Sequence, residues 1–210
     1  MPADVVHLVR HGEVDNPSKI LYGRMPGFGL SPLGHRMAAA AVESLADRPI
    51  VSLVASPLQR TRESAAPWAE RFGLEPQLDE RVIEPSNRFE GINVRRDLPS
   101  RPKLWPYLVA PWRPSWGEAY RSIVRRMRAA IGDAHASVES GEVVIVSHQL
   151  PIWMVALSLA GKPLPHDPRK RRCALSSITS VAVRDGRYVE VGYSEPAAAL
   201  AADATDLGAV

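Results

Sequence analysis

The sequence of 210 residues has a single cysteine, Cys173, so it cannot form an internal disulfide. A lone cysteine is typical of proteins from reducing compartments. A long apolar run is also missing, because polar residues and a proline interrupt the most apolar segment, 143–160, which falls short of the roughly 20 residues that span a bilayer. The first residues lack the basic start and apolar stretch of a signal peptide. We therefore expect a cytoplasmic protein with no membrane partner.

Lysine is scarce: only four of the 26 basic residues are lysines, and the others are arginines. The planar guanidinium of arginine donates two parallel hydrogen bonds to a phosphate group. The net charge is only +3, and the one short basic run, 169–172, accompanies no nucleic-acid-binding motif. We expect no nucleic-acid partner.

Three short apolar runs predict buried strands at 5–9, 50–56 and 142–147. Amphipathic or apolar helical segments alternate with them, and the first helix opens with Ser31 as N-cap and Pro32 at its first position. The other helices are expected within 56–73, where the pattern also suggests a capped start, and at 118–138 and 150–161. Two alternating segments, 177–183 and 187–193, predict a closing hairpin. This order indicates a three-layer α/β/α sandwich with a mostly parallel central sheet.

The chain is expected to form one domain, residues 1–195, which is long enough to bury a substantial core. Within it, residues 85–117 form an irregular, lid-like insertion with five prolines between Pro99 and Pro114. The alanine-rich tail, 196–210, shows no packing pattern and is expected to be flexible.

Polar residues follow each of the three buried strands. Arg10 and His11 follow the first strand, an exposed Arg60 is expected just after the second, and His148 follows the third. The carboxyl ends of the strands in such a sheet form the ligand-binding crevice, and Arg60 falls in a first helical turn, where an anion is favoured. Gly12 is expected to free the backbone, so that Arg10 and His11 both face the crevice. Together these groups predict a site for a phosphoryl group.

Several segments resemble the histidine phosphatase superfamily, which includes the cofactor-dependent phosphoglycerate mutases. They are "LVRHGE", "ASPLQRTRESA", "DERVIEPSNRFEG", "WGEAY" and "VVIVSHQLPIW", and the resemblance extends from about Val5 to Tyr193. It implies a histidine acid phosphatase-type phosphomonoesterase that acts on a small phosphorylated molecule without a cofactor or metal.

The resemblance also assigns roles to residues. His11 is the implied nucleophile, phosphorylated on its ring, and Glu84 the implied donor of a proton to the leaving oxygen and later the base that activates water. The implied phosphate contacts are Arg10, Asn16, Arg60, His148 and the backbone N–H of Gln149.

The sequence departs from the family pattern at several positions. Val14 and Pro17 stand where members often carry threonine and asparagine, Asn16 lies one residue early, and Gln149 replaces a common glycine. The segment around Glu84 also differs, so Glu13 and Glu118 remain alternative proton donors.

Three other functions stay open at this point. The first is a phosphoglycerate mutase-type phosphotransferase, although the chain is short for the insertions of such enzymes. The second is a non-catalytic phosphate-binding regulatory module on the same fold. The third is a metal site formed by His7, His11 and Glu13, which alternation places on one face of the first strand. The substrate and the oligomeric state are not determined by the sequence.

Overall fold

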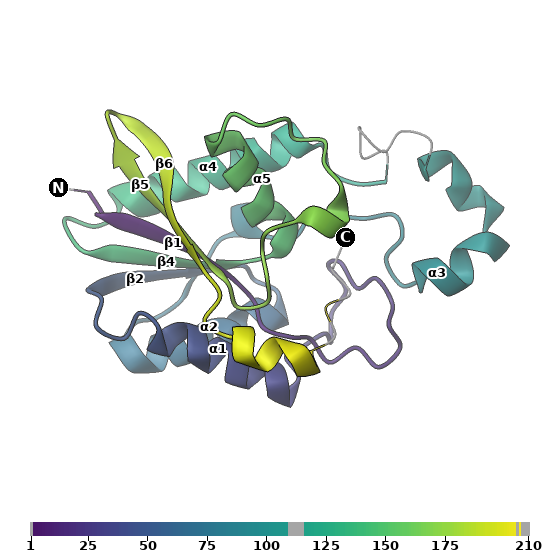
Figure 1. The fold of residues 1–210 in the computed structure, drawn as a ribbon, viewed down its shortest axis with the longest axis horizontal. Coiled ribbons are helices and arrows are strands. Elements are labelled where there is room, and N and C mark those ends of the chain that lie inside the picture. Colours follow the sequence, from purple (N-terminus) through teal and green to yellow (C-terminus); the bar gives the residue numbers. More distant parts are fainter. Residues whose placement is uncertain (1, 109–115, 205, 207–210) are drawn as a thin grey trace.

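The computed structural model describes residues 2–108, 116–204 and 206. Its described strands form one six-stranded sheet in the order β3-β2-β4-β1-β5-β6 (Figure 1). The four strands from β3 to β1 are parallel, β5 runs antiparallel to β1, and β6 pairs antiparallel with β5. The strands are β1 (Val5–Arg10), β2 (Ile50–Ala55), β3 (Gln77–Leu78), β4 (Glu142–Ser147), β5 (Ile178–Arg184) and β6 (Arg187–Ser194). The mostly parallel sheet and the closing hairpin are confirmed.

Helices cover both faces of this sheet, which confirms the three-layer sandwich (Figure 1). One face is covered by α1 (Pro32–Glu43) and α2 (Gln59–Phe72), and the other by α4 (Tyr120–Ala136) and α5 (Gln149–Leu159). The remaining helices are short: α3 (Val94–Asp97) and the 3-10 helices η1 (Glu80–Val82), η2 (Leu98–Ser100), η3 (Pro102–Leu108), η4 (Pro168–Lys170) and η5 (Ala198–Asp203). No helix in the described part of the chain is long and apolar enough to cross a membrane.

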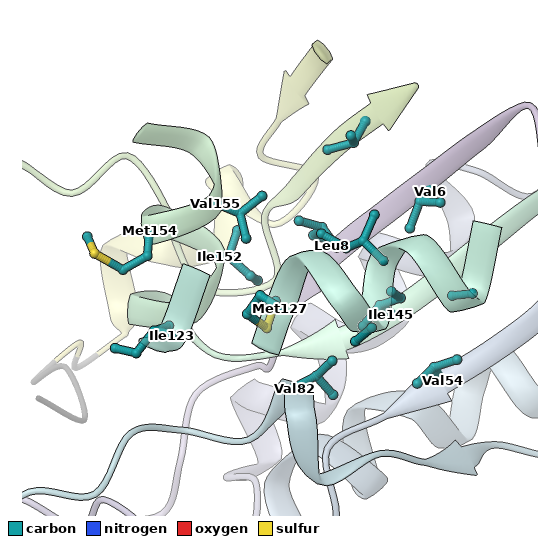
Figure 2. Packing of buried hydrophobic residues seen from close by; sticks show 14 of the residues in the cluster. Val6, Leu8, Val54, Val82, Ile123, Met127, Ile145, Ile152, Met154 and Val155 are labelled. Carbon is teal, nitrogen blue, oxygen red and sulfur yellow. The ribbon is translucent and has the colours of Figure 1, made fainter. Parts of the chain in front are cut away.

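The central strand β4 is buried on both faces, which explains its continuous apolar sequence. Val143 and Ile145 pack into the cluster under α4 and α5 (Figure 2), whereas Val144 and Val146 pack into the cluster over α1 and α2. Adjacent residues therefore point to opposite layers, as the period of a strand requires. The two cores hold the carboxyl ends of β1, β2 and β4 in fixed positions.

The two helices at one face begin differently. The Ser31 hydroxyl accepts a hydrogen bond from the Gly34 N–H at 2.9 Å, which confirms the predicted cap of α1. Helix α2 instead begins after Leu58 without any side-chain cap, so the predicted capped start is wrong. The Ser56 hydroxyl lies 2.8 Å from the Nε2 atom of His148, so it contacts the residue that follows β4 instead of the start of α2.

The insertion and the tail lie at the edges of the sandwich. In the described part of the insertion, α3, η2 and η3 extend beyond the carboxyl end of the sheet (Figure 1), while residues 109–115 lie outside the described residues. The tail differs from the expected lack of packing, because Leu200 of η5 packs against the cluster that contains Leu33 and Met37 of α1. Its flexibility stays a prediction.

Candidate active site

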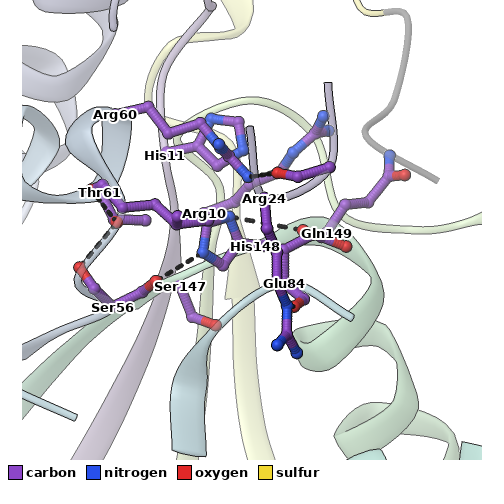
Figure 3. A network of polar contacts seen from close by, with 12 residues as sticks. Arg10, His11, Arg24, Ser56, Arg60, Thr61, Glu84, Ser147, His148 and Gln149 are labelled. Atoms are coloured by element: carbon purple, nitrogen blue, oxygen red, sulfur yellow. Dashed lines mark hydrogen bonds and ion pairs between the residues drawn. The ribbon is translucent and has the colours of Figure 1, made fainter. Parts of the chain in front are cut away.

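The exits of β1, β2 and β4 meet because these three strands are neighbours in the sheet. They bring together Arg10, His11, Arg60 and His148, each no more than 1% exposed (Figure 3). The rings of His11 and His148 meet edge to face, with 5.3 Å between their centroids. The structure therefore assembles the predicted cationic and imidazole groups in one place.

His11 is held in one orientation and as a neutral ring. Its Nδ1 atom lies 2.7 Å from the carbonyl oxygen of Gly12, so Nδ1 carries the proton and donates it. The Nε2 atom then keeps its lone pair. Burial lowers the pKa of His11 well below its ordinary value, and the charges of Arg60 and Arg10 lower it further. A neutral imidazole with a free Nε2 lone pair is a nucleophile.

A glycine is required at position 12 because a side chain would not fit there, and not because the backbone needs a conformation that only glycine adopts readily. A Cβ atom at this position would lie 2.3 Å from the carbonyl oxygen of Gly34, a backbone atom of α1. The φ angle of Gly12 is not positive, so its backbone is one that other residues can also adopt. The expected reason for this glycine was therefore wrong, and the close approach of α1 to the β1 exit replaces it.

Arg60 is buried, which corrects the expectation of an exposed side chain. The segment between β1 and α1 folds back over it, so that the Gly23 carbonyl accepts a hydrogen bond from Nη2 at 2.8 Å. The Tyr22 ring lies under the guanidinium, with 4.9 Å between its centroid and Cζ. Sequence reasoning missed Tyr22, and the only signal was an aromatic residue in the glycine-rich stretch "YGRMPGFG".

Glu84 lies on the segment after η1 and is fully buried against His148. Its Oε2 atom is 3.4 Å from Nδ1 of that ring, and neither carboxyl oxygen has a hydrogen-bond partner among the described residues. Burial raises the pKa of Glu84 to about 7, against the opposing charges of Arg60 and other arginines. A carboxyl group that is partly protonated at neutral pH suits a general acid.

The two alternative proton donors are engaged elsewhere. Glu118 forms an ion pair with Arg126 at 2.9 Å, and the Glu13 carboxylate accepts a hydrogen bond from the Ser31 hydroxyl at 2.5 Å. Neither of them is a fully buried carboxyl like Glu84. The geometry favours Glu84 over both.

His148 completes this cluster of buried groups. Burial lowers its pKa well below the ordinary value, helped by the charges of Arg60 and His11. The ring is therefore neutral at neutral pH. Ser147, the preceding residue, donates its hydroxyl proton to the Val82 carbonyl at 2.7 Å, which fastens the segment carrying Glu84 to the end of β4.

The last two predicted phosphate contacts differ, because the Asn16 side chain is held by the chain itself whereas the backbone N–H of Gln149 has no partner within its helix. The Asn16 amide closes onto the backbone of Ile20, donating at 2.8 Å and accepting at 3.3 Å. The Gln149 Oε1 atom accepts from Arg171 at 3.2 Å, while its backbone N–H begins α5 and belongs to the unsatisfied first turn of that helix. Asn16 also lines a pocket of about 220 Å³ together with Tyr22 and Asp206.

The metal alternative is not supported by the described residues. His7 uses both ring nitrogens, which lie 2.9 Å from Ser180 Oγ and 2.9 Å from Glu142 Oε2. No group of three or more histidine, cysteine or acidic side chains that could hold a metal ion gathers in the described ranges. His7, His11 and Glu13 are therefore not assembled into a ligand set.

Comparison with known proteins identifies the family. Residues 6–196 match the model of the histidine phosphatase superfamily (branch 1), so the chain belongs to this superfamily. A relative from Mycobacterium tuberculosis, "Uncharacterized protein Rv0525", is 51% identical over 94% of this chain and 100% of its own length. The "Probable phosphoglycerate mutase GpmB" of Yersinia enterocolitica is 26% identical over 90% of this chain and 89% of its own length.

Solved structures share the fold. The mycobacterial glucosyl-3-phosphoglycerate phosphatase Rv2419c in complex with VO3 superposes with a TM-score of 0.74 at 24% identity, covering 89% of this chain and 96% of that one. The phosphoserine phosphatase of Entamoeba histolytica in complex with 3-phosphoglyceric acid gives 0.73 at 21% identity, covering 90% and 96%. Membership of the superfamily indicates phosphatase or phosphotransferase activity, and these two neighbours show that the fold is shared.

Proposed function

We propose that the protein hydrolyses a small phosphomonoester through a phosphohistidine intermediate on His11. The observation that carries the proposal is one buried cluster with a neutral imidazole, two arginines and a carboxyl group whose pKa is raised to about 7. A protein that only binds phosphate needs the arginines but neither the oriented nucleophile nor the protonated acid.

In the first step, the Nε2 lone pair of His11 attacks phosphorus and forms an N–P bond. The bond between phosphorus and the ester oxygen breaks, and Glu84 gives its proton to the departing alcohol. Arg10 and Arg60 neutralise the phosphoryl oxygens, whose charge must be stabilised throughout the transfer. The step leaves phosphohistidine and an ionised Glu84.

In the second step, Glu84 acts as a base. It takes a proton from water, whose oxygen attacks phosphorus while the N–P bond breaks. The electron pair of that bond returns to Nε2 of His11, and inorganic phosphate leaves. Both the nucleophile and the acid are then regenerated, and the cycle requires no cofactor.

The surroundings of Glu84 support a substrate that carries a second anionic group. The leaving alcohol must lie beside Glu84, where Arg24 donates to the Glu84 carbonyl at 2.5 Å and the charge of Arg171 acts on the carboxyl group. Phosphoserine and 3-phosphoglyceric acid, named for one of the solved neighbours, both carry a carboxyl group. The proposed substrate class is therefore a phosphorylated carboxylic acid.

Phosphate release from a matched pair of substrates tests both parts. 3-Phosphoglycerate and glycerol 3-phosphate are both alkyl phosphates, but only the first has a carboxylate. We expect hydrolysis in the presence of EDTA, with a higher kcat/KM for 3-phosphoglycerate. Equal kcat/KM values for the two substrates would reject the proposal of a second anionic group. If no phosphomonoester released phosphate, the proposed phosphatase activity itself would be rejected.

A phosphoglycerate mutase is the second candidate, because GpmB-type relatives match most of the chain. A mutase returns the phosphoryl group to a second hydroxyl of the substrate instead of water. Incubation of 3-phosphoglycerate with the protein, followed by phosphorus NMR, separates these outcomes. Inorganic phosphate as the product supports the phosphatase, and 2-phosphoglycerate as the product would replace it by the mutase.

A further inference from the structure

Asp206, near the end of the chain, contacts Arg10 directly. Its two carboxylate oxygens accept hydrogen bonds from Nη1 and Nη2 of Arg10, each at 2.7 Å. A third bond runs from Nη1 to the Cys173 carbonyl, also at 2.7 Å. The guanidinium is thus held by two groups from the last third of the sequence.

These bonds use three of the N–H donors of the guanidinium, all on its two terminal nitrogens. Arginine has five N–H donors in a fixed plane. Both Nη1 donors are used, by Asp206 and by Cys173, and Asp206 takes the Nη2 donor on the same end. The edge that remains consists of Nε–H and the second Nη2–H, and Nε is buried without a hydrogen-bond partner among the described residues.

This remaining edge has the geometry that a phosphoryl group needs. Two parallel N–H donors on one edge of a guanidinium match two oxygens of a phosphate. A buried donor without a partner is costly, so the unpartnered Nε points to a ligand. The charge of Arg10 acts on both His11 and Glu84, so the guanidinium belongs to the same cluster of site groups.

We propose that Asp206 is a positioning residue, which fixes Arg10 so that its Nε/Nη2 edge faces the transferred phosphoryl group. This inference rests on the proposed phosphatase function and adds a residue outside the strand exits. Although burial lowers the pKa of Arg10, the charge and hydrogen bonds of Asp206 raise it above the ordinary value, so Arg10 stays charged.

The tail can place Asp206 beside Arg10 because the residues of the tail that precede Asp206 are packed against the domain. Ala197 is buried, and Leu200 and Ala204 pack against the cluster that contains Leu33 and Met37 of α1. Helix α1 follows the β1 exit, and its Gly34 is in close contact with Gly12 and Glu13. The packing of the tail on α1 therefore brings Asp206 to the end of β1, next to Arg10.

The opposite role would be competition, in which Asp206 occupies the place of phosphate and must leave. The two roles predict opposite effects of Asp206→Asn on phosphate affinity. Positioning predicts weaker binding, because the amide loses the charge and one of the two acceptors. Competition predicts tighter binding, because an internal rival is removed.

The test measures the affinity for inorganic phosphate by calorimetry. We expect Asp206→Asn to weaken binding roughly 10-fold, in keeping with the loss of charge-assisted hydrogen bonds that orient Arg10. Asp15→Asn is the matched control, since Asp15 lines the same pocket as Asp206 and no hydrogen bond joins it to Arg10. Removing this negative charge should leave phosphate binding unchanged or tighter.

A second measurement separates positioning from general loosening of the site. Asp206→Asn is repeated in Arg10→Lys and in Arg60→Lys backgrounds, since coupled residues give non-additive effects. The weakening should vanish with Arg10→Lys, because lysine has no second edge to orient, and should persist with Arg60→Lys. A similar loss in both backgrounds would overturn the proposal, as would unchanged or tighter phosphate binding by Asp206→Asn.

Failure of the inference is distinguishable from failure of the proposed function. If the unaltered protein binds phosphate and hydrolyses phosphomonoesters while Asp206→Asn does not weaken phosphate binding, only the positioning role is rejected. If the unaltered protein neither binds phosphate nor hydrolyses any phosphomonoester, the phosphatase itself is rejected.

Discussion

Burial determines the protonation states of the three central side chains. It lowers the pKa of both His11 and His148 and raises that of Glu84, because each charged form loses its hydration. The resting site therefore holds two neutral imidazoles and a partly protonated carboxyl group. This is the combination that the proposed first chemical step requires, with a lone pair on one side of phosphorus and a proton on the other.

Replacing Glu84 by glutamine removes the transferable proton and retains the shape. An alkyl alcohol leaves poorly as an alkoxide, whereas p-nitrophenolate leaves readily without a proton. We expect Glu84→Gln to slow the phosphorylation of His11 by an alkyl phosphate roughly 100-fold or more, within the usual range of general acid catalysis. With p-nitrophenyl phosphate the same step should slow much less. Pre-steady-state release of the alcohol measures this step, and equal slowing for both substrates would assign Glu84 to substrate positioning.

The pH dependence follows from the same carboxyl group. The first step needs protonated Glu84, so its rate should fall as pH rises through about 7, the pKa of this group. His11 needs to be neutral, and its lowered pKa keeps it so across the neutral range. Single-turnover rates with an alkyl phosphate, measured from pH 5 to 9, check this behaviour. Glu84→Gln serves as the control. Any pH effect that comes from ionisation of the substrate appears in both proteins, whereas the additional decline caused by deprotonation of Glu84 should appear only in the unaltered protein.

At the scale of secondary-structure elements, the junction between β1 and α1 holds His11, the proposed nucleophile, in place. The β1 exit approaches α1 so closely that Gly12 and Gly34 have no room for a side chain. The Gly12 N–H also donates to the Ser64 hydroxyl of α2 at 3.1 Å. Two helices of the same layer thus hold the backbone next to His11.

Gly12→Ala should therefore damage both stability and activity. The added methyl group would lie 2.3 Å from a backbone oxygen, and backbone atoms cannot move aside as a flexible side chain can. We expect a loss of about 1–3 kcal/mol in the free energy of unfolding, typical of overpacking, together with displacement of His11. Denaturant unfolding and phosphatase assays measure the two effects.

Gly132→Ala provides the control, because the nearest atom to its added Cβ would be the Tyr188 hydroxyl at 3.9 Å. Alanine is the better helix former, so this variant should be as stable as the unaltered protein or more stable. If Gly12→Ala behaved like Gly132→Ala, the close approach of α1 would not restrain the nucleophile.

The elements that the sequence predicted correctly have local signals. Continuous apolar runs mark β1, β2 and β4, and Ser31 with Pro32 marks the start of α1. The two-residue strand β3 has no such signal, because both of its residues are exposed. The start of α2 was misjudged since Ser56 binds His148, a partner 92 positions away along the chain.

In the candidate site, too, the features that depend on local sequence could be predicted, whereas those that depend on distant segments could not. The positions of Arg10, His11, Arg60 and His148 at strand exits follow from the order of strands and helices. The burial of Arg60 under Tyr22 and Gly23, and the contact between Asp206 and Arg10, depend on segments that return from elsewhere in the chain. No periodicity or spacing in the sequence specifies such returns.

Over the whole molecule, the two ends of the sheet carry different polar networks. The carboxyl ends of the strands hold the candidate active site, whereas Glu142 at the start of β4 accepts hydrogen bonds from His7 and Arg48. The first and last residues of β4 are about 16 Å apart at the usual strand rise. The network around Glu142 should therefore serve stability without affecting the chemistry.

Glu142→Ala tests this separation. It leaves the buried His7 ring without its partner at 2.9 Å, and unsatisfied buried groups cost about 1–3 kcal/mol. We expect a lower thermal unfolding midpoint and an unchanged affinity for inorganic phosphate at a temperature where the variant is folded. A loss of phosphate affinity would show that the two ends of the sheet are coupled.

The covalent intermediate on His11 is the most direct test of the central claim. The protein is mixed with a phosphomonoester, quenched in base within one turnover, and digested for peptide mass spectrometry, because phosphohistidine is labile in acid and stable in base. The account predicts one phosphoryl group on the peptide that contains His11 and none in His11→Ala. Phosphoryl label that persists in His11→Ala, or hydrolysis by that variant at the rate of the unaltered protein, would contradict it.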